Sequence, residues 1–114
     1  MATQQVNELL TAPDAKVYAT TMNGAPVSFV VSKARDQALF LGDDIPSPGD
    51  GKAYQLWVVD AAGATSVGVL ADDAGTVRQL TDDFSTGDAL AITLEPATGS
   101  TQPTTDPLVV LTAT

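Results

Sequence analysis

The feature that most constrains this chain is a series of short apolar runs separated by residues that form turns. The runs cover residues 17–22, 26–33, 37–42, 53–60, 65–71, 76–80, 89–95 and 107–114. Their spacing, roughly eight to twelve residues, is typical of β-sandwiches and barrels. Helical crossover segments are missing between the runs, which argues against a parallel α/β sheet. We therefore predict an all-β fold, an antiparallel β-sandwich of immunoglobulin-like architecture with about seven to eight short strands.

Two of the runs give the clearest local signals. Asn23–Gly24 separates two alternating segments, and this dipeptide is the strongest short-range signal for a β-hairpin. After it, Val27, Phe29 and Val31 alternate with more polar positions and predict the buried face of a strand. Residues 53–60 are apolar on both faces, which predicts a central strand covered on each side.

The N-terminal stretch has a different period. Val6, Leu9 and Leu10 stand at i, i+3 and i+4, the pattern of one helical stripe, and a proline ends the stretch. A helix of about two turns is unstable alone and must dock or fray. We therefore divide the chain into a segment, 1–13, with a short helix, and a β-sandwich domain, 14–114.

Charge and composition exclude several functions. The 114 residues carry fourteen Asp and Glu against five Lys and Arg, a net charge of -9. Such a surface repels nucleic acids and anionic lipid head groups, which are bound mainly through Lys and Arg, and it favours solubility. Cysteine and histidine are absent, so the chain has no disulfides and no thiolate or imidazole ligands for a metal.

The same composition argues against an enzyme. A serine or threonine nucleophile needs an adjacent base, and without histidine only lysines or carboxylates remain. The lysines Lys16, Lys33 and Lys52 stand in no recognisable nucleophile motif, and Glu8 and Glu95 are the only glutamates. We predict no catalytic residues and no cofactor.

Three aspartate pairs raise the question of a calcium site. None matches the spaced acidic loop of an EF-hand, and each stands beside residues that form turns and caps. The pairs are Asp43–Asp44, Asp72–Asp73 and Asp82–Asp83. We interpret them as turn residues and predict no metal site.

Aromatic and carboxylate residues leave two further questions open. Trp57 and Tyr54 could form an exposed platform for a sugar or a peptide, although a strand apolar on both faces favours a buried Trp57. Glu95 falls on the outward phase with Thr93, just before a proline. It could accept hydrogen bonds from the polar loop that follows or pair with Lys52, and we interpret it as a residue that holds this loop in place.

Several motifs at fixed order resemble a known family. They are Tyr-Gln-Leu-Trp-Val-Val-Asp at 54–60, Gly-Val-Leu at 68–70, Asp-Asp-Ala-Gly at 72–75, Ile-Thr-Leu-Glu-Pro-Ala-Thr-Gly-Ser at 92–100 and Gln-Pro-Thr at 102–104. With "LLTAPDAKV" near the start, they resemble the C-terminal extracytoplasmic domain of the anti-sigma-K factor family. The resemblance runs from Leu9 to Thr112, and Thr98 stands where members more often have glycine. Its structural motif consists of Tyr54, Leu56, Trp57, Glu95, Pro96, Gly99, Pro103 and Thr104.

The resemblance implies a function that the residues alone do not. Family members cross the membrane once, hold a sigma factor inactive through a cytoplasmic region, and release it after regulated proteolysis. This chain would then be the extracytoplasmic sensing or protective domain, with segment 1–13 next to the membrane. Its partners would be site proteases, with the sigma factor bound only by the cytoplasmic region that this chain lacks. We place the cleavage-sensitive region around Gln4 to Pro13, because a short helix beside proline should fray.

A second hypothesis stays open at this point. The chain could be a free-standing cell-surface module for adhesion or carbohydrate binding, with the platform of Trp57 and Tyr54 exposed. The two hypotheses differ in the exposure of the indole.

Overall fold

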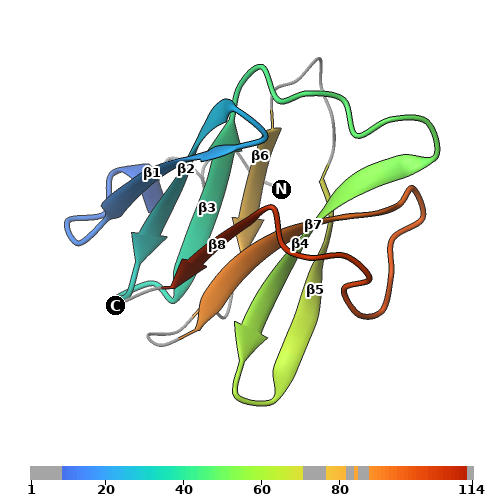
Figure 1. Cartoon of the computed structure of the whole chain (residues 1–114). Helices are drawn as coiled ribbons and strands as arrows, with labels where there is room; N and C mark the ends of the chain where they lie inside the picture. The colour runs from blue at the N-terminus through green and yellow to red at the C-terminus, as the bar shows by residue number, and fades with distance from the viewer. Residues whose placement is uncertain (1–8, 71–76, 82–83, 85–87, 113–114) are drawn as a thin grey trace.

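The computed structural model describes residues 9–70, 77–81, 84 and 88–112, and within them eight strands form two four-stranded antiparallel sheets. The strands are β1 (Lys16–Met22), β2 (Ala25–Ser32), β3 (Gln37–Gly42), β4 (Lys52–Asp60), β5 (Gly63–Val69), β6 (Val77–Thr81), β7 (Ala89–Pro96) and β8 (Val109–Thr112). The strand order is β1-β2-β3-β6 in the first sheet and β5-β4-β7-β8 in the second (Figure 1). The predicted antiparallel sandwich is confirmed.

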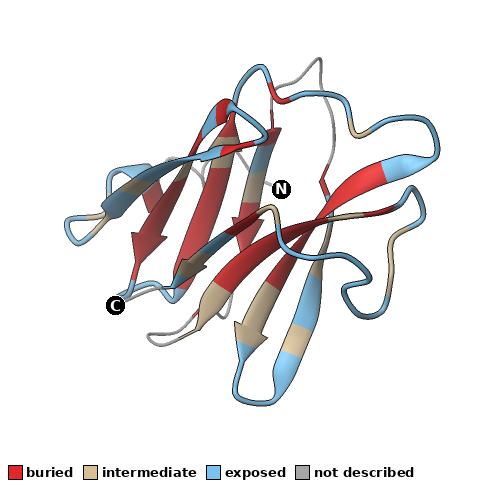
Figure 2. Ribbon diagram, viewed as in Figure 1, coloured by how far each residue is buried: buried red, intermediate tan, exposed pale blue. Residues whose placement is uncertain are grey.

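Buried residues are concentrated on the strands in the middle of each sheet, whereas β1 and β5 are largely exposed (Figure 2). This distribution follows from the strand order, since β2, β3, β4 and β7 have a neighbour on both sides. None of the helical segments in the described part of the chain is long and apolar enough to cross a membrane.

The predicted hairpin forms at Asn23 and Gly24. Their φ angles are 51° and 83°, the positive pair that a two-residue type I′ turn requires. Met22 therefore pairs with Ala25, and the antiparallel register continues without a break to the pair of Lys16 and Val31.

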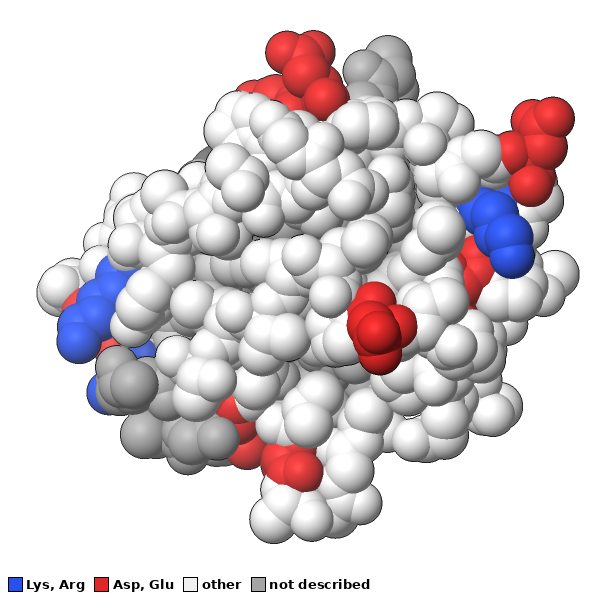
Figure 3. Space-filling view, viewed as in Figure 1, with Lys and Arg blue, Asp and Glu red and all other residues white. Residues whose placement is uncertain are grey.

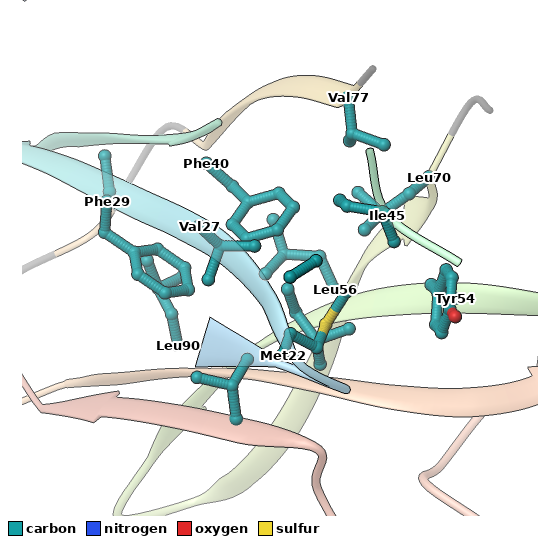
Figure 4. Packing of buried hydrophobic residues seen from close by; sticks show 14 of the residues in the cluster. Met22, Val27, Phe29, Phe40, Ile45, Tyr54, Leu56, Leu70, Val77 and Leu90 are labelled. Atoms are coloured by element: carbon teal, nitrogen blue, oxygen red, sulfur yellow. The ribbon is translucent and has the colours of Figure 1, made fainter. Parts of the chain in front are cut away.

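The main core lies between the two sheets (Figure 4). Val27, Phe29 and Val31 of β2 all belong to it, as their alternation predicted. The rings of Phe29 and Phe40 lie 5.1 Å apart, tilted at 49°, on neighbouring strands. Leu56 faces them from the second sheet and is fully buried. Burying each such side chain contributes about 1.5–3 kcal/mol, so this face of both sheets holds the sandwich together.

A second apolar cluster lies on the outer face of the first sheet. Leu9 is fully buried there against Val30, Leu39 and Leu80. Leu9 and Leu10 have helical geometry, while most of the predicted helix falls on residues 1–8, which lie outside the described part. Leu9 is therefore docked, one of the two outcomes that the sequence analysis allowed, because the first sheet presents an apolar surface to it.

Asp14 holds the same N-terminal segment, residues 9–15, to the first sheet. Its carboxylate accepts a hydrogen bond from the Ser32 hydroxyl at 2.6 Å and another from the Ala34 backbone N–H at 2.9 Å. These two hydrogen bonds, the Ser32 bond first, lower the pKa of Asp14. The segment is thus held by apolar packing at Leu9 and by two hydrogen bonds at Asp14.

Candidate functional site

Residues 97–108, here called the covering loop, connect β7 to β8 across the outer face of the second sheet (Figure 1). The loop contacts three strands of that sheet through hydrogen bonds. Gln102 donates to the Ala64 carbonyl of β5 at 3.1 Å, Ser100 bonds Gln55 of β4, and Thr104 bonds Glu95 of β7. The outer face of this sheet is therefore covered by polar contacts.

Glu95 is the centre of these contacts. The residue is fully buried, and its carboxylate accepts hydrogen bonds from the hydroxyls of Thr93, Ser100 and Thr104 and from the Thr104 backbone N–H. The Thr93 bond is 2.6 Å long and the Ser100 bond 2.8 Å. Glu95 thus accepts hydrogen bonds from the loop that follows it, one of the two interactions considered from the sequence. The other, a pair with Lys52, is not among its contacts within the described residues.

A chain of hydrogen bonds links this carboxylate to the indole. Trp57 Nε1 donates to Thr93 Oγ1 at 2.8 Å, and Thr93 Oγ1 donates to Glu95 Oε2. All three residues are fully buried. β4 pairs with β7, and the side chains of Trp57, Thr93 and Glu95 all lie on the outer face of this sheet. The hydrogen-bond chain is therefore built from two neighbouring strands.

Electrostatics favour an ionised Glu95. Burial of the carboxyl raises its pKa, but hydrogen bonds from Thr104, Thr93 and Ser100 oppose this effect and outweigh it. The resulting pKa is about 2, against an ordinary 4.5. A carboxylate that accepts hydrogen bonds on both oxygens is stabilised in its charged form. The ionised carboxylate therefore holds the covering loop through the hydrogen bonds that it accepts from Ser100 and Thr104.

Gln55 makes a second link between β4 and the covering loop. Its side-chain amide donates to the Ser100 carbonyl at 3.0 Å and accepts from the Ser100 N–H at 2.9 Å. The same amide donates to Ser66 of β5 at 2.7 Å. A side chain here replaces the backbone partner that a neighbouring strand would provide.

Gly99 allows this close approach. Its φ angle is 82°, in the left-handed region, and a Cβ atom there would lie 3.1 Å from a methyl carbon of Val69. Pro96 begins the same turn, since its carbonyl accepts from the Gly99 N–H at 2.7 Å. Pro103 is exposed and directly precedes Thr104. These motif residues shape the loop that Glu95 holds.

Tyr54 and Leu56 point to the opposite face, into the core between the sheets. The Tyr54 hydroxyl donates to the Pro46 carbonyl at 2.6 Å and so holds the loop between β3 and β4. A cavity of about 230 Å³ lies beside it, lined in part by Ile45, Pro48 and Lys52. The two faces of β4 thus hold two different loops.

The structure opposes an aromatic platform. Trp57 is fully buried and Tyr54 is 6% exposed, so neither ring can stack on a sugar from solvent. The predicted burial of Trp57 is confirmed, although the indole bonds Thr93 on the outer face of the second sheet and is not part of the core between the sheets. The sequence could not predict this partner, because it lies 36 positions away.

The other candidates for chemistry remain apart. Lys16, Lys33 and Lys52 are exposed, and Asp43 and Asp44 lie in the loop after β3. The aspartate pairs at 72–73 and 82–83 fall outside the described residues. Among the residues that the structure describes, no three His, Cys, Asp or Glu side chains gather as a metal site would require.

Three residues of the network were not singled out from the sequence: Gln55, Thr93 and Ser100. A signal was present for the first two. Gln55 is a polar residue within the most apolar strand, and Thr93 shares the outward phase of Glu95. Polar side chains at such positions must find partners when covered, and every buried side-chain N or O atom in the described residues has one.

Fold and site together define a β-sandwich whose most specific residues bind its own loops. The family model "Anti-sigma-K factor rskA, C-terminal" matches residues 1–108. The chain therefore belongs to the anti-sigma-K factor family, a family of regulatory proteins, and matches its C-terminal domain, as the motifs predicted.

Named relatives agree with this assignment. The "Anti-sigma-K factor RskA" of Mycobacterium ulcerans is 34% identical over 99 residues, which cover 85% of this chain and 43% of that protein. The protein of the same name from Mycolicibacterium vanbaalenii is 35% identical over 103 residues, 86% of this chain and 42% of that protein. A Streptomyces griseus protein, "Uncharacterized protein in phr 5'region", is 34% identical over 113 residues, 95% of this chain and 46% of that protein. The chain thus spans less than half the length of these relatives. No solved structure matches it.

Proposed function

We propose that this chain is the extracytoplasmic regulatory domain of a single-pass membrane anti-sigma factor. It would control the proteolysis of the segment that links it to the membrane. The sigma factor would bind a cytoplasmic region outside this chain, and site proteases would act between the domain and the membrane. Two facts support this proposal. The chain matches the C-terminal model of the family, and its relatives are more than twice as long as the part they share with it.

The observation that carries the proposal is the docked N-terminal segment. A protease binds its substrate as an extended, accessible strand, so a segment packed on a folded sheet is a poor substrate. Leu9 lies fully buried on the first sheet, and Asp14 is hydrogen-bonded to Ser32 and Ala34. Cleavage next to the domain would therefore require the segment to leave the sheet first.

Limited proteolysis tests this protection. Leu9→Asp places a charge in the apolar cluster, whereas Leu10→Asp makes the same change at a neighbour that is 45% exposed. We expect the first variant to be cut within residues 1–15 at least about tenfold faster than the second, because undocking costs less. Thermal unfolding of both variants should show the sandwich intact. Equal cutting rates would mean that docking does not protect the segment.

A labelling experiment tests the location. The chain has no cysteine, so Thr98→Cys introduces a single thiol into this domain, on the exposed loop. The experiment uses the full-length protein with any cysteine outside this chain replaced by serine. A membrane-impermeant maleimide should label it in intact cells as fully as in lysed cells. Labelling only after lysis would refute the extracytoplasmic placement.

A further inference from the structure

The outer strands of the two sheets are not equally protected against pairing with another chain. Within the described residues, β1, β6, β5 and β8 each lie at the edge of a sheet. Such an edge presents unpaired N–H and C=O groups, and proteins normally protect it by shortness, charge, irregularity or cover. In Figure 1, β1 forms the left side of the molecule.

Three of the edges carry such protection. β8 has four residues, and β6 has five with an exposed Arg78. β5 contains Gly63 and Gly68, its register with β4 shifts at Leu56/Trp57, and Gln102 of the covering loop bonds its Ala64 carbonyl. β1, by contrast, has seven residues in unbroken register with β2 and contains neither proline nor glycine. Its one charged side chain, Lys16, stands at the first residue of the strand and leaves the other six residues uncharged.

Charge also distinguishes this edge. Residues 15–32, which include β1 and β2, hold one lysine and no acidic residue, in a chain with fourteen acids and a net charge of -9. Figure 3 shows acidic side chains at the top, right and bottom of the molecule, one right of the centre, and a few partly hidden beside basic side chains at the left edge, while the surface over the β1–β2 hairpin is mostly uncharged. No other sheet edge lies in so long a stretch without an acidic residue, so repulsion between two copies of the chain is weak at β1.

We propose that two copies of this domain associate by antiparallel pairing of β1 with β1, centred on Ala19. This register uses all seven residues of the strand and places Lys16 opposite Met22, Val17 opposite Thr21 and Tyr18 opposite Thr20. The two lysines do not face each other, so no like charges are opposed. Val17, 66% exposed in one copy, lies beside the second copy. The first sheet of one copy and the first sheet of the other then form one continuous sheet of eight strands.

Pairing through a single edge buries little surface, so the free domain associates weakly. Two domains attached to one membrane would meet at a higher effective concentration, which strengthens the same contact without new interactions. The pairing of β1 with β1 does not depend on proteolysis, so it can be tested independently of the proposed function.

Disulfide trapping tests the register, since the chain has no cysteine. Opposed residues in an antiparallel pair have Cα atoms about 4.5–5.5 Å apart, within the range of a disulfide. Ala19→Cys should therefore form a covalent dimer at least about tenfold faster than Val110→Cys, an exposed position on the β8 edge. Mixed Val17→Cys and Thr21→Cys proteins should cross-link with each other faster than either does with itself. Equal rates for Ala19→Cys and Val110→Cys would overturn the proposal.

Sedimentation equilibrium at high protein concentration supplies a second test. Ala19→Lys opposes two lysines at the centre of the pair and should abolish dimer formation, whereas Val110→Lys should leave it unchanged. Added salt should strengthen the dimer of the unmodified chain, because it screens the net repulsion. β1 pairing would be refuted if the unmodified chain were purely monomeric and Ala19→Cys formed no disulfide-linked dimer. It would also be refuted if Ala19→Lys and Val110→Lys weakened the dimer equally.

Discussion

The two sheets of this domain cover their outer faces by opposite means. On the first sheet, the N-terminal segment places Leu9 among apolar side chains and adds two hydrogen bonds at Asp14. On the second, the covering loop bonds a buried carboxylate, Glu95, and a side-chain amide, Gln55. The segment joins a strand of its sheet at Lys16, whereas the covering loop joins strands of its sheet on both sides, β7 and β8. A segment held mainly by one apolar side chain can open locally, while a directional network within a closed loop opens only with its sheet.

The largest effect is expected from removing the carboxylate of the second sheet. Glu95→Ala leaves the donors of Thr93, Ser100 and Thr104 without their acceptor in a buried site. We expect a loss of about 2–4 kcal/mol in the free energy of unfolding, measured by urea denaturation. Asp106→Ala, a change at an exposed carboxylate in the same loop, is the control and should change little. A similar loss in both variants would show that Glu95 is not special.

Stability should also depend on pH through the same group. The pKa of Glu95 is about 2 in the folded chain against 4.5 ordinarily, so the folded state favours the ionised carboxyl. Its contribution, on the order of 2–3 kcal/mol, is present above pH 4.5 and is lost as the pH falls from there towards 2. Urea denaturation at several pH values should show this fall.

Glu95→Gln is the matched control for the pH experiment, because its side chain does not titrate. The variant should lose the part of the pH dependence that lies between these values. An unchanged pH profile in Glu95→Gln would assign the acid sensitivity to other carboxyls.

A smaller effect is expected within the chain of hydrogen bonds. Thr93→Val keeps the shape of the side chain but removes the acceptor of the indole N–H and one donor to Glu95. We expect a loss of about 1–2 kcal/mol, with Trp57 still emitting at short wavelength because it stays buried. Fluorescence and urea denaturation check both points. A red-shifted emission would mean that Thr93 keeps the covering loop closed.

The smallest global effect is expected on the first sheet. Leu9→Ala should lower the free energy of unfolding by only about 1 kcal/mol, less than a core leucine, because the segment can undock without unfolding the sandwich. Hydrogen exchange should accelerate at the Ala34 amide, which bonds Asp14, and not at β4. Loss of protection throughout the molecule would show that the segment is part of the cooperative core, and the contrast between the two faces would then disappear.

Much of the fold could be read from local patterns. Alternation placed Val27, Phe29 and Val31 inward, and Asn23–Gly24 formed the expected turn, because both depend on residues next to one another. The outward phase of Glu95 was also readable, as was the polar loop after it. The donors that reach Glu95 from Ser100 and Thr104 could not be predicted, since they depend on how the loop folds back over its own strand.

By itself, the sequence determined the strands, most of the turns and the family, because alternation, turn residues and motif order act over short distances. Only the tertiary structure decided the neighbours: β3 beside β6, β4 beside β7, Leu9 on the outer face of the first sheet, and the covering loop on Gln55 and Glu95. These choices depend on which distant surfaces can exclude water together and satisfy each other's hydrogen bonds. A local sequence pattern predicts which face of a strand is apolar, but not which distant segment will cover that face.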